Sequence, residues 1–585
     1  MSKINIKVNS ISYHVEGGGT ILSALKEIHI HVPTLCFLKD INEIGACRMC
    51  MVEVKGAKNL QASCVTEVRD GMEIYTHSHI VQRARKEVLS MILSAHDRKC
   101  LTCSRKGVCE LMQAAHELGI DVIEYDGYNP KFELDLQSPA IVRDNNKCIT
   151  CRRCVSVCSN VQNVYAIQPV NRGFETIIGS IYDKSLNETS CIMCGQCIMA
   201  CPTGALKERS EIDDVWTAIL DPELHVVVQT APAVRVAIGE EFGMPVGTIA
   251  TGKMVTALRK LGFDKVFDTN TGADLTIMEE GYELLSRIQK GGKLPMITSC
   301  SPGWIKYCEH NFHDFLDNLS SCKSPHQMLG AMLKSYYAEV AGIDPSKIFV
   351  VSVMPCTAKK YEKSRPEMEV YGHRDVDAVV TTRELANMIK QTGINFAMLP
   401  DSEFDNPLGM ATGAGAIFGA TGGVMEAAIR TVAHVLSNGQ EDIVEFESCR
   451  GKNNNKEFNV TIGDVKVRGV VVHGTGNAKD LLKKIKDGEV EYDFIEIMGC
   501  TGGCITGGGQ PIVSARDGER FDVWTLRKDA IYQIDKDLPL RKSHENPFII
   551  KLYDEFLDKP NSHKAHKYLH THYTRRHKYT NKNSI

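Results

Sequence analysis

Apolar and polar positions alternate regularly along the second half of the chain. Short apolar runs that are typical of buried strands lie at His225–Val228, Leu294–Thr298, Ile348–Val353, Val376–Val380 and Phe494–Met498. Stretches with helical spacing lie between them, at Lys253–Leu261, Glu279–Ile288, Arg383–Ile389 and Gly423–Leu436. Strands that alternate with helices predict an α/β domain with parallel sheets and flanking helices. We expect this domain over residues 210–585, with a small C-terminal segment.

The front of the chain has shorter elements. Lys3–Val8 and Ser12–Val15 predict a hairpin, and Ile21–Ile28 and Val81–Ser94 have helical spacing. We expect small α+β, ferredoxin-like domains at 1–79, 80–125 and 126–209. With the α/β domain they make four, which agrees with the length of 585 residues.

Composition narrows the class of protein. Hydrophobic residues make up 43% and charged residues 24%, an ordinary globular balance, and the net charge of −4 does not favour nucleic-acid binding. The basic tail from His563 to Ile585 is interpreted as a solvated terminus. No apolar run approaches the length of a membrane span, and the first residues lack the apolar core of a signal peptide. We therefore expect a cytoplasmic protein that uses no membrane.

Cysteine is the unusual component of this sequence. The chain has 22 cysteines, and fifteen of them precede residue 202. Structural disulfides are disfavoured in the reducing cytoplasm, so many cysteines there indicate metal ligation or redox chemistry.

Two cysteine groups leave the bound metal open. Cys36, Cys47, Cys50 and Cys64 have the spacing C-x10-C-x2-C-x13-C, which suits a 2Fe–2S cluster, with structural zinc as the alternative. The second group has the spacing H-x3-C-x2-C-x5-C and consists of His96, Cys100, Cys103 and Cys109. One imidazole and three thiolates suit zinc and a 4Fe–4S cluster equally.

The third group repeats itself and is specific. The spacing C-x2-C-x2-C-x3-C occurs at Cys148, Cys151, Cys154 and Cys158, and again at Cys191, Cys194, Cys197 and Cys201. In two-cluster ferredoxins the fourth cysteine of each run ligates the other cluster. We therefore expect one 4Fe–4S site with Cys201 in place of Cys158, and a second with Cys158 in place of Cys201. Clusters in series indicate that this region relays single electrons.

Three of the predicted strands lead into cysteines. The loops after them carry Cys300, Cys356, and the pair Cys500 and Cys504. Open α/β sheets bind ligands beyond the carboxyl ends of their strands, so these loops are predicted to converge on one buried cofactor. Ordinary core cysteines at strand ends are the alternative.

The motifs of these loops resemble the three signatures of iron-only (FeFe) hydrogenases. They are T-S-C-x-P-G-W at 298–304, M-P-C-x-x-K-x-x-E at 354–362 and E-x-M-x-C-x-x-G-C-x-x-G-G-G-x-P at 496–511. The domain order resembles the monomeric clostridial type. The resemblance implies a 2Fe–2S cluster in the first group, a 4Fe–4S cluster in the second, and an H-cluster. The H-cluster is a 4Fe–4S cube joined by cysteine to a diiron unit with CO, cyanide and a dithiolate amine.

The resemblance also implies roles for individual residues. Cys356, Cys500 and Cys504 ligate the cube, Cys504 bridges to the diiron unit, and Lys359 binds a cyanide. Ala231, Pro232, Met354, Phe418 and Met498 line the diiron pocket, although core packing alone would also explain them. Protons travel along Cys300, Glu280, Ser320 and Glu283, with Arg287 at the mouth; from spacing alone, these charges would be an exposed helix face.

One position departs from the family pattern. The first signature normally has two adjacent cysteines, of which the second ligates the cube, and here Ser301 occupies that position. A hydroxyl is a harder and less acidic donor than a thiol. Three outcomes follow: Ser301 ligates through oxygen, Cys300 shifts to become the ligand, or the site is weakened.

The leading hypothesis is a ferredoxin-dependent enzyme that interconverts protons and H₂, a monomer whose diiron unit is inserted by maturation proteins. A low-activity hydrogen-sensing or electron-transfer relative is the alternative that Ser301 suggests. A third hypothesis is a subunit of an NADH-linked dehydrogenase, against which the three signatures argue.

Overall fold

The computed structural model describes residues 3–579 except positions 124, 126, 127, 407, 438, 441, 442, 463, 464, 515–517 and 519. The N-terminal residues form a five-stranded sheet in the order β2-β1-β5-β3-β4. Its strands are β1 (Lys3–Val8), β2 (Ile11–Glu16), β3 (Met51–Val54), β4 (Gln61–Ala62) and β5 (Glu73–Tyr75). β1 and β2 pair as the predicted hairpin, and α1 (Ile21–Glu27) begins after Thr20, which caps it.

Short elements frame the next cysteine-rich loops. α2 (His79–Ser94) and α3 (Glu110–Glu117) flank the second cysteine group. Each run of the internal repeat leads into a short helix, α4 (Arg153–Ser156) or α5 (Gln196–Ala200), and the residues before them, Arg152 and Gly195, both have a positive φ. β6 (Ile141–Arg143) pairs with β9 (Leu206–Glu208), and β7 (Gln168–Val170) pairs with β8 (Ile177–Gly179). The sequence repeat is therefore also a structural repeat.

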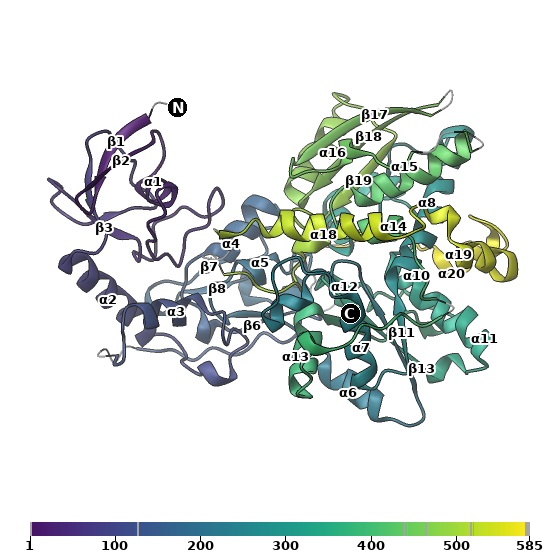
Figure 1. Cartoon of the computed structure of the whole chain (residues 1–585), viewed down its shortest axis with the longest axis horizontal. Coiled ribbons are helices and arrows are strands. Elements are labelled where there is room, and N and C mark those ends of the chain that lie inside the picture. Colours follow the sequence, from purple (N-terminus) through teal and green to yellow (C-terminus); the bar gives the residue numbers. More distant parts are fainter. Residues whose placement is uncertain are drawn as a thin grey trace.

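Two four-stranded sheets form the centre of the larger domain (Figure 1). The first has the order β11-β10-β13-β16 and is wholly parallel; its strands are β10 (His225–Thr230), β11 (Lys265–Asp268), β13 (Ile348–Met354) and β16 (Ala378–Thr381). The second has the order β12-β19-β18-β17, with β12 (Met296–Ile297), β17 (Asn455–Ile462), β18 (Val465–His473) and β19 (Phe494–Met498). Only its edge strand β17 is antiparallel. The predicted α/β class with parallel sheets is confirmed. A small hairpin, β14 (Glu369–Val370) and β15 (His373–Arg374), stands apart.

Helices pack around the two sheets. They are α6 (Ile212–Leu220), α7 (Thr251–Leu261), α8 (Thr269–Lys290), α9 (Pro302–Asn311), α10 (Pro325–Met332), α11 (Ala338–Ala341), α12 (Ala358–Glu362), α13 (Thr382–Gln391), α14 (Gly413–Ile417), α15 (Gly423–Leu436), α16 (Thr475–Lys486), α18 (Val523–Asp537), α19 (Pro547–Leu552) and α20 (His563–Leu569). In the described part of the chain, none of them is both long and apolar enough to cross a lipid bilayer.

The long helix α8 lies in the interior and contacts α10, α14 and α15. Every residue from Thr269 to Gly281 is buried. The sequence predicted a helix only from Glu279 onwards, because polar residues in the first half of α8 hide its helical periodicity. Those buried polar residues include Glu279 and Glu280, which makes α8 the element that carries titratable groups into the core.

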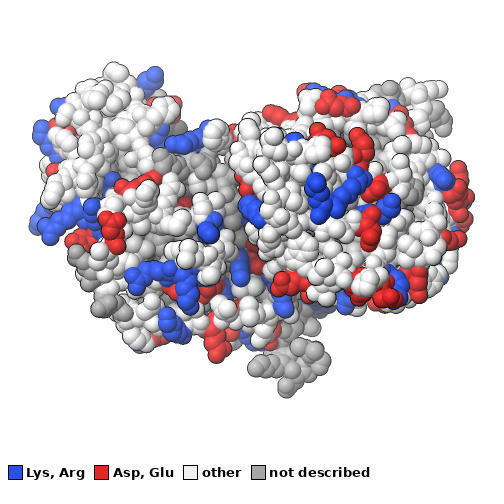
Figure 2. All heavy atoms as spheres, turned by 60° about the horizontal axis from the view of Figure 1, so that its bottom comes forward, with Lys and Arg blue, Asp and Glu red and all other residues white. Residues whose placement is uncertain are grey.

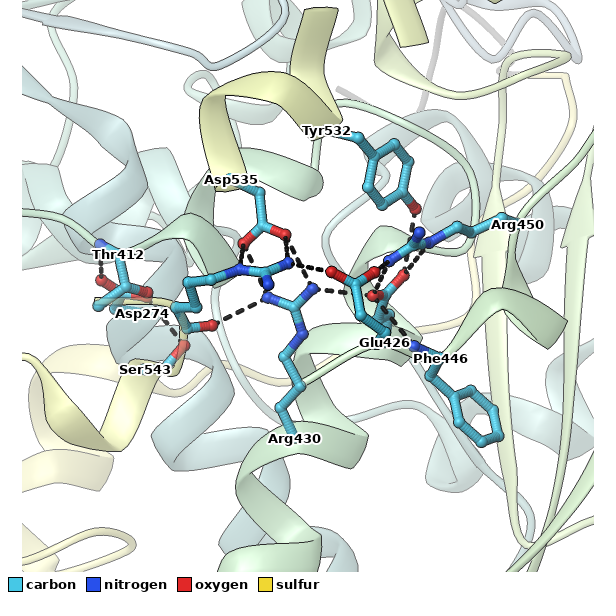
Figure 3. A network of polar contacts seen from close by, with 11 residues as sticks. Asp274, Thr412, Glu426, Arg430, Phe446, Arg450, Tyr532, Asp535 and Ser543 are labelled. Atoms are coloured by element: carbon cyan, nitrogen blue, oxygen red, sulfur yellow. Dashed lines mark hydrogen bonds and ion pairs between the residues drawn. The ribbon is translucent and has the colours of Figure 1, made fainter. Parts of the chain in front are cut away.

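A buried ion network ties the C-terminal segment to the core (Figure 3). Arg430 of α15 bonds Glu426 at 2.8 Å and both carboxylate oxygens of Asp535 of α18, at 2.8 and 3.0 Å. Arg450 and Arg541 bond the same two carboxylates from the other side. Glu426, Arg430 and Asp535 have no exposed side-chain surface. Removing Arg430 therefore takes from both buried carboxylates the counter-ion that they share and leaves each with one arginine.

We predict that Arg430→Met destabilises the protein by about 3–5 kcal/mol, because Glu426 and Asp535 lose a buried counter-ion. The matched control is Lys347→Met, which removes the exposed pair with Glu223 and should cost less than about 1 kcal/mol. The midpoint of urea unfolding, followed anaerobically by circular dichroism, measures both. Equal midpoints for the two variants would contradict the prediction.

Candidate cofactor sites

Three cysteine-bearing loops meet at one cavity beyond the ends of β12, β13 and β19. Cys300, Cys356, Cys500 and Cys504 all line this cavity, which has a volume of about 90 Å³. The loops come from both central sheets, so the cavity lies where the carboxyl ends of the two sheets face each other. Such a position is where open α/β sheets bind their ligands.

The remaining walls of the cavity are mostly apolar. Ala231, Pro232, Met354, Phe418 and Met498 all line it. Glycines let the backbone approach closely: a Cβ on Gly507 would lie 2.2 Å from the carbonyl oxygen of Pro355, and one on Gly503, which has a φ of +98°, would lie 2.5 Å from the amide nitrogen of Thr421. The cavity is therefore a dry, sulfur-lined space that larger residues at these positions would fill.

The cavity thiols are chemically suited to a metal cluster. Burial raises the pKa of Cys356, and burial with the nearby Cys356 raises the pKa of Cys504 to about 12. Burial, then Cys356 and Cys194, raises the pKa of Cys500. Without a cation these thiols would stay neutral, whereas a bound metal deprotonates coordinating thiols and supplies the missing positive charge. Soft sulfur donors in a dry pocket fit an iron–sulfur cluster.

Lys359 presents a cation at the wall of the same cavity. Its Nζ donates to the carbonyl oxygen of Cys300 at 3.1 Å and to Glu362 at 2.8 Å. Burial works to raise the pKa of Glu362, but Lys359 and His326 lower it to about 2. Glu362 and His326 therefore hold Lys359 in place as a charged donor. Glu362 is the last residue of the second signature, but the sequence alone indicated no role for it or for His326.

Cys300 and Ser301 face different surroundings. Cys300 packs with Cys504 against the apolar cluster that contains Phe418 and Met498, whereas Cys356 packs with the cysteines of the repeat. Ser301 Oγ accepts a hydrogen bond from the amide of Gly499, the residue before Cys500, at 3.0 Å. The hydroxyl therefore lies beside the third signature loop, while the Cys300 thiol lies on the side of Phe418 and Met498.

Polar groups with hydrogen bonds among them lie between the Cys300 loop and the surface. The Ser299 hydroxyl donates to Glu280 Oε1 at 3.3 Å, the Ser320 hydroxyl donates to Glu283 Oε2 at 3.0 Å, and Arg287 donates to Glu283 Oε1 at 2.6 Å. Glu280 is wholly buried, and Glu283 is partly exposed, so the simple exposed-face interpretation is wrong. Burial, with repulsion from Glu283, raises the pKa of Glu280 to about 7. A carboxyl with this pKa takes up and releases protons near neutral pH.

The repeated cysteines gather around two separate cavities. Cys148, Cys151, Cys154 and Cys201 line one, and Cys158, Cys191, Cys194 and Cys197 line the other. Each cavity thus has three cysteines from one run and the fourth from the other run.

The cysteines of the first two groups also come together locally. Cys47 N–H donates to Cys36 Sγ at 3.5 Å, and the sulfurs of Cys50 and Cys64 lie 3.2 Å apart. His96 is buried, its Nδ1 has no hydrogen-bond partner, and burial lowers its pKa, which keeps the ring neutral as metal ligation requires. Cys100 and Cys103 are near Cys109, whose pKa burial and these two thiols raise. The donor sets of both groups fit a metal centre.

The four sites adjoin one another in a branched arrangement that leads to the large cavity. Asn42 Nδ2 donates to the carbonyl oxygens of Cys36 and Cys151, at 2.6 and 3.1 Å, so the first group adjoins the first repeat site. The second group adjoins the same site, because a Cβ on Gly204 would lie 2.4 Å from Cys103 Sγ. A Cβ on Gly508 would lie 2.4 Å from the carbonyl oxygen of Cys194, which places the second repeat site against the third signature loop.

Sequence reasoning missed the residues that join these sites. Gln196 donates to the carbonyl oxygen of Thr506 at 3.1 Å, and Thr357 donates to that of Met193 at 2.7 Å. Both are ordinary polar residues beside cysteines, and nothing in their spacing distinguishes them.

Fold and sites together define an iron–sulfur oxidoreductase with a buried sulfur-lined cofactor pocket. Five family matches agree with this class. Residues 1–79 match "2Fe-2S iron-sulfur cluster binding domain", 85–124 match "NADH-ubiquinone oxidoreductase-G iron-sulfur binding region" and 147–205 match "4Fe-4S dicluster domain". Residues 224–508 match "Iron only hydrogenase large subunit, C-terminal domain", and 521–576 match "Iron hydrogenase small subunit".

Individual relatives cover the whole chain. NADP-reducing hydrogenase subunit HndD from Solidesulfovibrio fructosivorans is 48% identical over 98% of this chain and 100% of its own length. Iron hydrogenase 1 from Clostridium pasteurianum is 44% identical over 97% and 99%. A solved structure of the [FeFe]-hydrogenase HydA (deltaEFG) is 43% identical, with a TM-score of 0.55, and covers 63% of this chain and 99% of that one.

The chain therefore belongs to the iron-only hydrogenase family. It is an oxidoreductase that interconverts protons and H₂, and its iron–sulfur domains relay electrons to an H-cluster. The alternative of a low-activity sensing or electron-transfer relative is not favoured by relatives of this identity over the full length.

Proposed function

We propose that the chain holds one 2Fe–2S cluster, three accessory 4Fe–4S clusters and one H-cluster. The first cysteine group would hold the 2Fe–2S cluster, the His96 group one 4Fe–4S cluster, and the two repeat cavities one each. These assignments are supported by the crossed lining of the repeat cavities and by the neutral, unpartnered ring of His96. When bound, the H-cluster supplies the two-electron chemistry at its diiron unit and an amine that exchanges protons.

Electrons would reach the large cavity along a branched route. Both the first group and the His96 group adjoin the cavity of Cys148, Cys151, Cys154 and Cys201. From there the route continues to the cavity of Cys194, which adjoins the loop of Cys500. Two N-terminal sites would thus feed one common path.

Protons would reach the same cavity by a separate route that ends at Cys300. Glu283, with Arg287 bonded to it, would receive a proton from solvent and pass it through the Ser320 hydroxyl to Glu280. Glu280 would exchange it with the Cys300 thiol, which lines the cavity. Lys359 would bind an anionic ligand of the diiron unit, because it is the buried cation that lines the cavity.

Ser301 would be the fourth ligand of the cube, through its oxygen. Its hydroxyl lies within hydrogen-bond distance of the backbone at Gly499, beside the cube ligand Cys500, whereas Cys300 is grouped with the diiron pocket and Glu280. A harder oxygen donor alters the electronic character of one iron but leaves the relay thiol in its place.

Mössbauer spectroscopy of the four-iron cube, before the diiron unit is inserted, tests this ligand. We expect one iron with oxygen ligation in the wild type, a spectrum typical of four sulfur ligands in Ser301→Cys, and loss of iron in Ser301→Ala. If Cys300 is the ligand instead, Cys300→Ala loses the iron and Ser301→Ala keeps it.

A soluble ferredoxin would be the electron donor, and the chain would act in the cytoplasm as a monomer after maturation proteins insert the diiron unit. The likeness to a subunit of an NADP-reducing hydrogenase favours a second candidate, in which the chain oxidises H₂ and a partner subunit passes the electrons to NADP⁺. Figure 2 shows basic groups interspersed with acidic ones on the lobe formed by the N-terminal domains. That lobe holds the two sites where electrons would arrive.

Hydrogen evolution from reduced methyl viologen, after the diiron unit is loaded, tests the activity. The observation that carries it is the convergence of Cys356, Cys500 and Cys504 on one dry cavity. The proposed activity would be contradicted if the protein showed the CO and cyanide infrared bands and had all accessory clusters reduced, but evolved no hydrogen. Hydrogen evolution from reduced ferredoxin by the isolated chain tests the first candidate. H₂-dependent reduction of NADP⁺ by the chain purified together with its partner subunit tests the second.

A further inference from the structure

A cysteine, a histidine and a carboxylate meet beside the proposed proton path. One ligand atom from each of Glu283, Cys322 and His570 lies within 4.8 Å of the others. Cys322 Sγ lies 3.9 Å from Glu283 Oε2, and both Cys322 and His570 are buried. Thiolate, imidazole and carboxylate are the three ligand types that zinc takes in proteins.

The backbone holds these side chains in a fixed arrangement. Cys322 and His570 face each other in an antiparallel bridge, which hydrogen bonds on either side reinforce: Lys323 N–H to Leu569 O at 2.8 Å and Thr571 N–H to Ser321 O at 2.7 Å. Glu283 comes from the rigid helix α8. The three ligands thus come from three distant parts of the sequence and do not depend on one mobile loop.

His570 also has the environment of a metal ligand. Its Nε2 lies 2.9 Å from the carboxylate of Glu279, and its Nδ1 lies 2.8 Å from the Ser321 hydroxyl, which in turn lies 3.3 Å from Glu283 Oε2. With the proton on Nε2, the carboxylate orients the ring and leaves the Nδ1 lone pair directed towards the Ser321 and Glu283 side. Metal-binding histidines typically donate their other ring nitrogen to a carboxylate in this way.

The local charge favours a cation. Glu279, Glu280 and Glu283 lie on one helix, and Arg287 is the guanidinium that pairs with Glu283. Burial, followed by the charges of Glu283 and Glu280, raises the pKa of the Cys322 thiol well above its ordinary value. A divalent metal would neutralise the carboxylates and allow the thiol to ionise.

We propose that Glu283, Cys322 and His570 form a zinc-type metal site, and that a bound Zn²⁺ inhibits the enzyme by occupying the carboxylate that passes protons inward. Glu283 as a zinc ligand no longer accepts a proton from solvent or from Ser320, so the path to Glu280 is interrupted. The inhibition half of this inference rests on the proposed proton path; the binding half does not.

The test uses the fully loaded enzyme and Zn²⁺, with Cys322→Ala as the variant and Cys308→Ala as the matched control, since Cys308 is another buried cysteine outside every proposed site. After zinc treatment and desalting, we expect one more Zn²⁺ per chain in the wild type and in Cys308→Ala than in Cys322→Ala. Zinc K-edge absorption should show one sulfur ligand among nitrogen and oxygen ligands. Zinc should inhibit hydrogen evolution reversibly, with EDTA restoring it, and the inhibiting concentration should rise at least about tenfold in Cys322→Ala.

Equal zinc content in the wild type and Cys322→Ala, or a zinc spectrum without sulfur, overturns the site. One sulfur-ligated zinc without loss of activity overturns the inhibition. Zinc content and the zinc absorption spectrum do not depend on turnover, so they test the site even if the wild type evolves no hydrogen. Lack of hydrogen evolution by the wild type would contradict the proposed function, not the metal site.

Discussion

Cys500→Ala is expected to reduce hydrogen evolution below detection. Cys500 lines the cavity and lies near Cys356 and Cys504, and its loss leaves the proposed cube one thiolate short in a pocket that offers no replacement sulfur at that position. Iron content and the electron paramagnetic resonance of the reduced cube measure the loss of the cluster, and viologen-driven gas evolution measures activity.

Cys449→Ala is the matched control for this experiment. Cys449 is a buried cysteine of the larger domain that does not line the cavity, so its variant should keep its iron and its activity. Wild-type turnover in Cys500→Ala would show that the chemistry takes place elsewhere in the protein.

Glu280→Gln is expected to lower the rate of hydrogen evolution about 100-fold or more at neutral pH. Glutamine preserves the hydrogen bond that Ser299 donates, but it cannot titrate, whereas the pKa of Glu280 of about 7 lets it both accept and release a proton. The CO and cyanide infrared bands should remain, because the cofactor itself is not contacted by this side chain in the proposed path.

Glu279→Gln is the control for Glu280→Gln, because it also replaces a buried carboxyl group of α8 by an amide. Glu279 is also fully buried, but it bonds Tyr553, the backbone of Asn561 and His570, and it is not itself a member of the proposed path. Its variant should retain most of the activity. If both variants lose activity equally, Glu280 acts through the packing of α8 and not through proton transfer.

The spacing of cysteines could predict which cysteines gather around the two repeat cavities because ligand geometry is local. The short C-x2-C steps bring neighbouring sulfurs to one metal, and the crossed sharing between the two runs follows from the repeat alone. The three strand-end cysteines were predictable for a similar reason: parallel strands deliver the residues after them to a common edge.

Other features depended on contacts between distant segments. The first half of α8 was missed because buried polar residues such as Asp274 break the apolar pattern. Asp274 is satisfied by hydrogen bonds from Thr412 and Ser543, which lie far away in the chain. His326 bonds Glu362, which in turn bonds Lys359. Cys322 likewise pairs with His570. No local sequence pattern indicates that these distant segments lie close together.

The crossed cysteine sets have a consequence for how this region gains and keeps iron. Each cavity of the repeat needs one sulfur from the opposite run, so neither half can assemble its centre while the other half is unfolded. Under iron limitation, molecules should accumulate with both centres or with neither, and half-filled ones should be scarce. The common path for electrons would then be present or absent as a single unit.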